Sequence, residues 1–254
     1  MTILYGDAMD LVGTLEPASI QAVVTSPPYW SQRVYGDDPG REIGWGSLDE
    51  YLEDLGRLLD GLHRATDDKA TMWWVIGDKA SGSGGAGGDH LKKGSKNWIP
   101  KYGKAPSGIP SGQWCMVPYR FAQMAQQRGW LVRSVIVWDK SPNMRPESAD
   151  HANRPLVSTE RIILLAKQVR HRWYPKRLIE PADVWHIHPH RGAKAIRHYA
   201  PYPGEIPKRA ILASTRRGDT VLDPFAGSGT TLSVAEDLGR IPIGFELYQP
   251  EEAP

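Results

Sequence analysis

The chain has 254 residues, 40% of them apolar, and a formal net charge of +2, enough for one large α/β domain, with two small domains as the alternative. Its single cysteine, Cys115, excludes a disulfide framework and favours a reducing setting. The start of the chain does not read as a secretory signal and no run is long and apolar enough to span a bilayer, so we expect a cytoplasmic protein with no membrane partner.

The charge is unevenly distributed along the chain. Residues 1–68 hold 13 acidic and 4 basic side chains, so the remainder is basic. Two stretches, 92–112 and 161–177, contain basic and aromatic residues but no acidic ones. Because cations hold phosphates and aromatic rings stack on bases, these stretches favour a nucleic acid partner over ordinary solvated faces.

Short β-rich runs alternate with helical patterns along the chain, which predicts an α/β fold with a doubly wound, mostly parallel sheet. The predicted strands are 3–6, 21–26, 71–77, 132–138, 161–167, 220–225 and 242–246. The predicted helices are 48–65, 117–129, 206–215 and 229–239. No helical pattern separates strands 132–138 and 161–167, so these two are expected to form an antiparallel hairpin.

Residues 79–113 have the composition of a long flexible loop, rich in glycine, serine and lysine. A loop of this length inside a compact domain is usually functional or disordered. Its glycine run does not predict a phosphate cradle, because no helix follows to supply an N-terminus.

The strand at 21–26 ends abruptly in the sequence TSPPYW. On one interpretation the two prolines break the strand and the aromatic rings pack in the core. On the other, the strand end forms a site, because the fixed φ of Pro27 holds its carbonyl still beside the Ser26 hydroxyl. TSPPYW alone does not separate the two.

Residues 219–246 read DTVLDPFAGSGTTLSVAEDLGRIPIGFE, a strand, a glycine turn, a helix and a second strand that ends in Glu246. This order is typical of nucleotide-type cofactor sites, in which glycines admit the ligand and the terminal acid accepts bonds from ribose hydroxyls. Asp223-Pro224-Phe225 stands where a dinucleotide fingerprint has Gly-x-Gly. The motif therefore favours an adenosine without a diphosphate.

DPFAGSGTT and TSPPYW together resemble the amino-methylating DNA methyltransferases, which transfer a methyl group from S-adenosylmethionine to adenine N6 or cytosine N4. The Pro-Pro segment precedes the glycine motif here, which resembles the circularly permuted, beta branch of that family. The resemblance covers nearly the whole chain and implies a Rossmann-like, circularly permuted fold in which the first and last strands are neighbours. The cofactor residues that it implies are Asp7, His198, Tyr202, Asp223, Pro224, Phe225, Gly227, Gly229, Thr230 and Glu246.

The same resemblance gives the opening motif a chemical role, with Ser26, Pro27, Pro28 and Tyr29 as the catalytic residues. Acceptors at Ser26 Oγ and the Pro27 carbonyl would draw the two N–H bonds of a base amine, and Tyr29 would stack on the flipped base. Trp30 is expected to line the same pocket. A serine before Pro-Pro favours cytosine N4, with adenine N6 as the alternative.

Double-stranded DNA is the expected partner, and a homodimer is left open. Residues 168–197 are expected to form a small target-recognition segment, helped by the loop 79–113. The predicted DNA-contacting side chains are Lys92, Lys93, Lys96, Lys101, Arg170, Arg172 and Lys176, with Lys104 alongside them in the loop. An RNA or protein-amide methyltransferase and a non-catalytic DNA-binding module are the remaining alternatives.

His186, His188 and His190 alternate in the sequence WHIHPH and resemble metal ligands in their spacing alone. No carboxylate or cysteine shares this spacing, and methyl transfer needs no metal. We therefore expect no metal site. Asp139 and Lys140 are expected either to flank the target pocket or to form an ordinary charge pair at a strand end.

Overall fold

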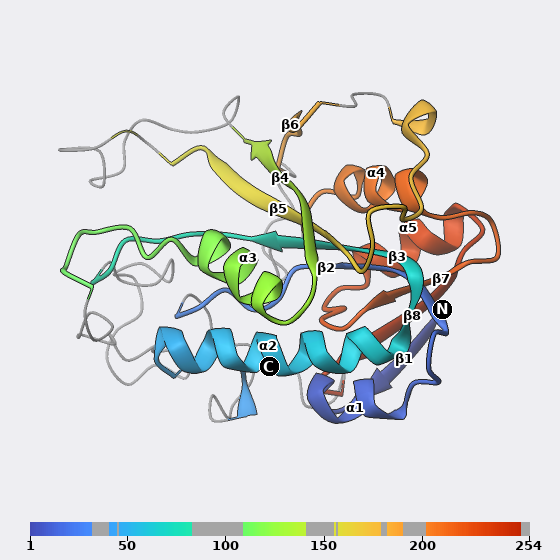
Figure 1. Cartoon of the computed structure of the whole chain (residues 1–254), viewed down its shortest axis with the longest axis horizontal. Coiled ribbons are helices and arrows are strands. Elements are labelled where there is room, and N and C mark those ends of the chain that lie inside the picture. The colour runs from blue at the N-terminus through green and yellow to red at the C-terminus, as the bar shows by residue number, and fades with distance from the viewer. Residues whose placement is uncertain are drawn as a thin grey trace.

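The structure is a computed structural model, and it describes residues 1–31, 41–44, 46–82, 109–140, 155, 157–178, 182–189 and 202–249. In this part of the chain, one eight-stranded sheet lies between two layers of helices (Figure 1). None of the helices described is long and apolar enough to cross a membrane.

The strand order of the sheet is β1-β8-β7-β2-β3-β5-β4-β6. Only β5 runs against its neighbours, β3 and β4, and the other pairs are parallel, which confirms the expected antiparallel hairpin in a mostly parallel sheet. The strands are β1 (Thr2–Tyr5), β2 (Ile20–Thr25), β3 (Thr66–Ile76), β4 (Leu131–Asp139), β5 (Thr159–Ala166), β6 (Val184–His186), β7 (Thr220–Asp223) and β8 (Ile241–Glu246).

Three helices cover one face of the sheet, namely α1 (Ala8–Thr14), α2 (Leu48–Ala65) and α3 (Val117–Gln127). The other face carries α4 (Glu205–Ser214) and α5 (Thr230–Asp237). Successive strand residues point to opposite faces, so Trp74 packs toward the first layer and Trp73 toward the second. This explains why the central strands read as continuous apolar runs: both of their faces are buried.

The predicted strands and helices all form, with ends shifted by a few residues. The long helix α2 begins where Ser47 and Glu50 form a reciprocal capping box. Three of the described elements were missed by the sequence analysis: the seven-residue α1, the three-residue 3-10 helix η4 (Pro175–Arg177) and the three-residue β6. All three are too short to show a periodic apolar pattern.

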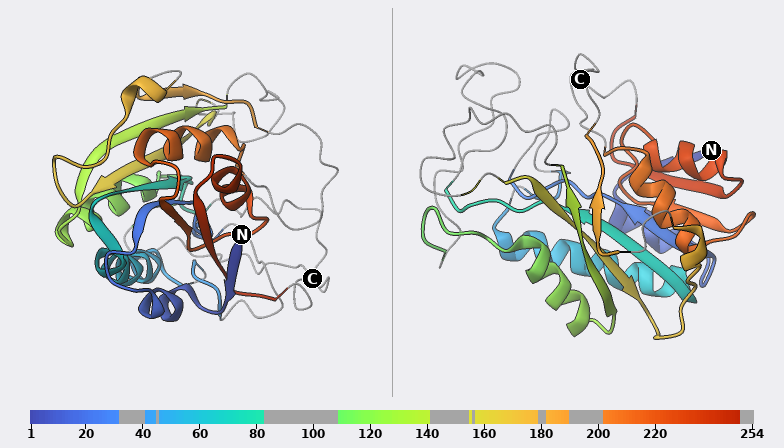
Figure 2. Two further views of the ribbon diagram at one scale, coloured as in Figure 1. Left: turned by 90° about the vertical axis from the view of Figure 1, so that its right-hand side faces the viewer. Right: turned by 90° about the horizontal axis from the view of Figure 1, so that it is seen from above.

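The first and last strands lie side by side, with Thr2 opposite Ile243 and Tyr5 opposite Glu246. Figure 2 shows this blue strand beside the red elements of the C-terminal part. The Gly6 amide continues the pairing by donating to the Glu246 carbonyl at 2.9 Å. This adjacency is what a permuted chain order requires, while the permutation itself stays a prediction.

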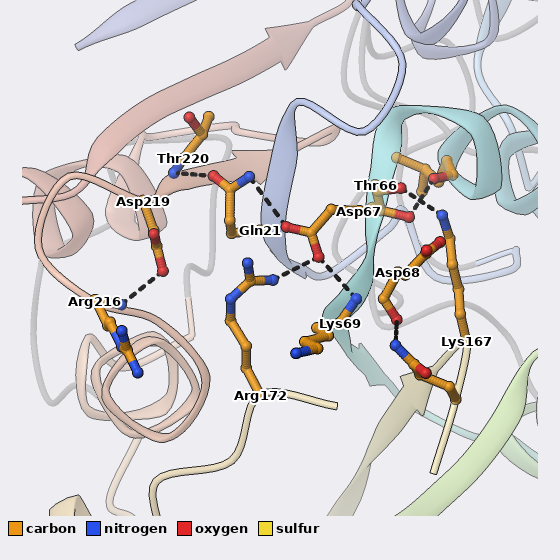
Figure 3. A network of polar contacts seen from close by, with 12 residues as sticks. Gln21, Thr66, Asp67, Asp68, Lys69, Lys167, Arg172, Arg216, Asp219 and Thr220 are labelled. Atoms are coloured by element: carbon orange, nitrogen blue, oxygen red, sulfur yellow. Dashed lines mark hydrogen bonds and ion pairs between the residues drawn. The ribbon is translucent and has the colours of Figure 1, made fainter. Parts of the chain in front are cut away.

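A polar network ties the sheet together at the edge where β2, β3 and β7 begin (Figure 3). The Asp67 carboxylate accepts from Gln21 Nε2 at 3.2 Å and from Arg172 Nη1 at 2.5 Å. Gln21 Oε1 in turn accepts from the Thr220 amide at 2.8 Å. The segment after β5 is thus anchored to the start of three strands.

Candidate active site

A cavity of about 450 Å³ opens at the opposite end of the sheet, at the carboxyl ends of the parallel strands. Its lining takes residues from the carboxyl ends of β1, β2, β7 and β8 and from just beyond β4. Because β5 is antiparallel, its amino end reaches the same place and contributes Glu160. Ligands of open α/β sheets bind at this edge, and the volume suits a small molecule.

The segment Ser26–Pro27–Pro28–Tyr29 follows β2 directly and lines the cavity throughout. The strand itself is buried up to Thr25, and Pro27 is buried as well. Tyr51 of α2 donates from its hydroxyl to the Pro28 carbonyl at 2.9 Å. The turn is therefore held from behind by α2 while its serine and tyrosine face the cavity.

The Tyr29 hydroxyl donates to Glu160 Oε2 at 2.6 Å, and the Ser26 side chain also hydrogen-bonds with Tyr29. Burial, followed by the negative charge of Glu160, raises the pKa of Tyr29 well above 10. Lys140 Nζ lies 2.5 Å from Glu160 Oε1, so each oxygen of this carboxylate contacts a partner. The result is a connected polar chain from Lys140 to Ser26.

Asp223 ends β7 beside the glycine turn and is only 2% exposed. Its carboxylate accepts from the Thr25 hydroxyl at 2.6 Å, the Thr231 hydroxyl at 2.7 Å and the Phe225 amide at 3.1 Å. Burial raises the pKa of Asp223, and these three hydrogen bonds act in the opposite direction. The Asp223 carboxylate thus connects β2, β7 and α5 through hydrogen bonds.

Tyr202 closes the same side of the cavity. Its hydroxyl hydrogen-bonds with the Thr231 hydroxyl, and burial together with the nearby Asp223 raises the pKa of Tyr202 well above 10. The phenol therefore stays protonated. It forms a neutral wall of the cavity next to a buried carboxylate.

Glu246 stands at the end of β8 and accepts from the Gly227 amide at 2.8 Å through Oε2. Gly227 has a φ of 51°, which glycine adopts without strain, so the turn can bring its amide onto the acid. Burial raises the pKa of Glu246 above its usual 4.5. Asp7, which caps α1 by accepting from the Met9 amide at 2.8 Å, lines the cavity beside it.

The structure brings most of the predicted catalytic and cofactor residues into this one cavity. Those that line it are Asp7, Ser26, Pro27, Pro28, Tyr29, Tyr202, Asp223, Pro224, Phe225, Gly227, Thr230 and Glu246. Gly229 lies outside the lining and begins α5 with a φ of 77°. His198 and the loop lysines Lys92, Lys93, Lys96, Lys101 and Lys104 lie outside the described residues.

Trp30 is placed differently from the expectation that it would line the pocket. Its ring is 8% exposed, packs in the core beside α2 and is absent from the cavity lining. Its indole nitrogen donates to the Gly46 carbonyl at 3.0 Å. For this residue the core-packing interpretation of the motif is the correct one.

β5 ends at the end of the sheet that lies away from the cavity. The segment that follows it therefore holds three of the predicted DNA-contacting residues far from the cavity, namely Arg170, Arg172 and Lys176. Arg172 is paired with Asp67 in the network of Figure 3. Further along the segment expected to recognise the target, β6 pairs with β4 at the side of the sheet, and among the described residues of that segment Pro189 lines the cavity. The placement separates the three basic residues from Ser26, and their contact with DNA stays a prediction.

Several lining residues were missed by the sequence analysis, above all Glu160, Thr231, Glu42 and Tyr248. Tyr248 donates from its hydroxyl to Glu42 Oε1 at 3.1 Å. Glu160 carries no local signal, because it looks like an ordinary polar residue just before an apolar strand. Only the antiparallel pairing of β5 brings it to Tyr29.

His186 Nδ1 lies 2.9 Å from the Asp139 carboxylate, so Asp139 pairs with this histidine. Lys140 instead lines the cavity and pairs with Glu160. Among the described residues, no group of three histidine, cysteine or acidic side chains is arranged to hold a metal ion.

Comparison with known proteins identifies the family. Residues 20–251 match the family model described as DNA methylase. The chain is 35% identical to the type II methyltransferase M.SmaI of Serratia marcescens, covering 97% of this chain and 86% of that one, and 35% identical to M.Cfr9I of Citrobacter freundii, covering 97% and 83%.

Two solved structures share the fold. The cytosine-N4-specific PvuII DNA methyltransferase gives a TM-score of 0.72 at 20% identity over 98% of this chain and 82% of that one. The putative DNA modification methylase TTHA0409 of Thermus thermophilus, in complex with S-adenosyl-L-methionine, gives 0.66 at 24% identity over 99% and 89%. The chain belongs to the N6/N4 DNA methylase family, whose methyl donor is S-adenosyl-L-methionine, and it is a DNA methyltransferase related to the type II restriction-modification enzymes.

Proposed function

We propose that this chain transfers a methyl group from S-adenosyl-L-methionine to the N4 amine of a cytosine, at a specific DNA sequence and after the base is flipped from the duplex. The observation that carries the proposal is that Ser26 lines the same cavity as Asp223 and Glu246. An acceptor for the base amine and the acids expected for the donor thus share one space. The printed specificity of the PvuII enzyme supports cytosine N4.

The cavity fits the methyl donor in size and in the character of its walls. A volume of about 450 Å³ lies within the range of small-molecule sites. Glu246, which accepts from the Gly227 amide, would accept from ribose hydroxyls, and Asp7 would lie beside the adenine. Asp223 and Tyr202 would bound the methionine end. When bound, the cofactor supplies an electrophilic methyl group on a sulfonium.

The residues of the β2 end would prepare the amine. A base amine is a weak nucleophile because its lone pair is delocalised into the ring. Ser26 Oγ and the Pro27 carbonyl would accept its two N–H bonds and draw the nitrogen toward tetrahedral geometry. Positioning of this kind is worth several kcal/mol in methyl transfer, on the order of 7 for a well-oriented pair. Tyr29 would stack on the flipped base.

Adenine N6 is the second candidate, since the family includes both amines and serine before Pro-Pro favours cytosine only as a tendency. The experiment is to incubate the purified protein with unmethylated plasmid DNA and S-adenosyl-L-methionine, digest the DNA to nucleosides and identify the product by mass spectrometry. N4-methylcytosine is expected. N6-methyladenine would overturn the base assignment and leave the mechanism standing.

A Ser26→Ala variant tests the role of the serine separately from cofactor binding, because it removes one acceptor for the base amine and leaves the cavity open. Cofactor binding, measured by calorimetry, should be retained while methylation falls. An RNA substrate tested in parallel separates the RNA alternative. Absence of cofactor binding in the unaltered protein would support the non-catalytic alternative and sink the enzyme proposal.

A further inference from the structure

Methyl transfer to a neutral amine leaves one proton too many on the nitrogen. The new N–C bond uses the amine's lone pair, and the C–S bond breaks with its electron pair moving to sulfur, so the methylated nitrogen is cationic. Because the lone pair of a base amine is delocalised into an electron-poor ring, the cationic form of that amine loses a proton more readily than a carboxylic acid does. A carboxylate within reach of Ser26 would therefore take the proton readily.

Among the described residues that line the cavity, four carboxylates besides Asp7 come into question: Glu42, Glu160, Asp223 and Glu246. Asp223 accepts from Thr25, Thr231 and Phe225. Glu246 accepts from Gly227, and both acids lie on the side proposed for the cofactor. Glu42 pairs with Tyr248. Glu160 is the one joined to Ser26 by a hydroxyl, that of Tyr29.

We propose that Ser26, Tyr29 and Glu160 form a proton path out of the active site, with the Glu160 carboxylate as the final acceptor. The inference rests on the proposed methyl transfer. The amine proton passes to Ser26 Oγ while the serine hydroxyl proton passes to Tyr29 Oη. The phenol proton passes to Glu160 Oε2. Serine and tyrosine end neutral, the methylated amine ends neutral, and Glu160 ends protonated.

The geometry suits this direction of transfer. The Oη–Oε2 distance of 2.6 Å is that of a hydrogen bond to a charged acceptor. Tyr29 donates to Glu160, and the interaction of the Ser26 side chain with Tyr29 brings the serine hydroxyl to the other end of this path. Lys140 holds the other carboxylate oxygen at 2.5 Å, which fixes Glu160 and leaves Oε2 for the phenol.

The first test is the single-turnover methylation rate of Glu160→Gln, which keeps the size of the side chain and an oxygen for Tyr29 but removes the base. The rate should fall roughly 100-fold, the lower range for general acid–base catalysis, with cofactor affinity unchanged by calorimetry. The rate of Tyr29→Phe should fall by a similar factor. The rate of the double variant should fall no further, because the two substitutions interrupt the same proton path. A wild-type rate in Glu160→Gln would overturn the proposal.

The matched control is Glu53→Gln, which removes a carboxylate paired with Arg128 at 2.7 Å on α2, outside the cavity lining. It should methylate at the wild-type rate. A readout that needs no cofactor is the titration of Tyr29 by NMR of ¹³C-labelled tyrosine, assigned with Tyr29→Phe. Because Glu160 raises the pKa of Tyr29, Glu160→Gln should lower it. An unchanged Tyr29 titration would contradict the contact.

Chemical rescue separates a proton acceptor from a residue that merely orients the ring. Glu160→Ala opens space on the cavity wall, and formate or substituted acetates can be added to refill it. The rescued rate should rise with the basicity of the added carboxylate. A rate independent of basicity would overturn the acceptor role. Absence of methylation in the unaltered protein would instead refute the proposed function, so the two failures are distinguishable.

Discussion

Thr25 and Asp223 are 198 residues apart in the chain and joined by a 2.6 Å hydrogen bond from the threonine hydroxyl to the aspartate. Thr25 ends β2 and Asp223 ends β7, and both side chains are buried. The bond therefore couples the strand that presents Ser26 to the strand that opens the glycine turn. This contact would fix the position of the methyl acceptor's site relative to that of the methyl donor.

Replacing Thr25 with valine keeps the shape and removes this donor. The free energy of unfolding should fall by about 1–3 kcal/mol, the usual cost of leaving a buried acceptor short of a partner. The pKa of Asp223 should rise further, because the Thr25 bond lowers it. Cofactor affinity by calorimetry should weaken. Thr66→Val removes a comparable buried bond to the Leu62 carbonyl at the far edge and should lower stability alone.

Gly77 leaves room for the Tyr29 ring. A Cβ at position 77 would lie 2.6 Å from Tyr29 Cε2, so Gly77→Ala should push the ring out of place. Overpacking of this kind costs about 1–3 kcal/mol, and methylation should fall while cofactor affinity holds. Gly129→Ala meets no atom within 4 Å but has a φ of 86°, so it serves as a control for backbone strain alone. Equal activity loss in both variants would contradict the steric explanation.

Glu246 should make stability depend on pH. Burial raises its pKa above 4.5, so the folded protein binds the proton more tightly than the unfolded chain. The free energy of unfolding therefore falls as the pH rises from 4.5 through the raised pKa. Glu246→Gln lacks this contribution and should gain stability relative to wild type between about pH 4 and pH 7. Urea unfolding without cofactor at both pH values measures it.

The same Glu246→Gln variant should bind the cofactor more weakly, because an amide is a poorer acceptor for ribose hydroxyls. Glu53→Gln controls for the replacement of a carboxylate by an amide. A stability difference that does not change with pH would show that Glu246 titrates alike in the folded and unfolded protein.

Arg172 separates two roles. Its side chain is about three-quarters buried and paired with Asp67, so Arg172→Gln should lower the free energy of unfolding by about 1–3 kcal/mol and leave the methylation rate unchanged. Asp67→Asn should destabilise similarly. Loss of DNA affinity in Arg172→Gln without loss of stability would instead support the DNA contact predicted from the sequence.

The loop lysines Lys92, Lys93, Lys96, Lys101 and Lys104 should bind DNA phosphates. Replacing all five with glutamine should weaken DNA binding and reduce the slope of log affinity against log salt by about 0.9 for each phosphate that is no longer neutralised. Lys208→Gln, on an exposed position of α4, is the control. An unchanged slope in the five-lysine variant would remove the loop from the DNA interface.

The strands and the two motifs could be predicted from the sequence because their signals are local. VVTSPPYW shows a strand end within eight letters, and DPFAGSGTT shows a turn and a helix start. Glu160 could not be predicted as a partner of Tyr29, because that contact depends on β5 running against β3. Trp30 misled for the opposite reason: it is the last residue of the motif TSPPYW, yet its ring packs into the core.

The neighbouring positions of β1 and β8 determine when, during synthesis of the chain, the complete site can form. β1 leaves the ribosome before the other strands described, and its partner in the sheet is the last of them. A nascent chain that has not reached β7 already contains Ser26 but lacks Asp223 and Glu246. Partial products of translation would thus hold the methyl acceptor's site without the donor's, and activity would begin only when β8 pairs with β1.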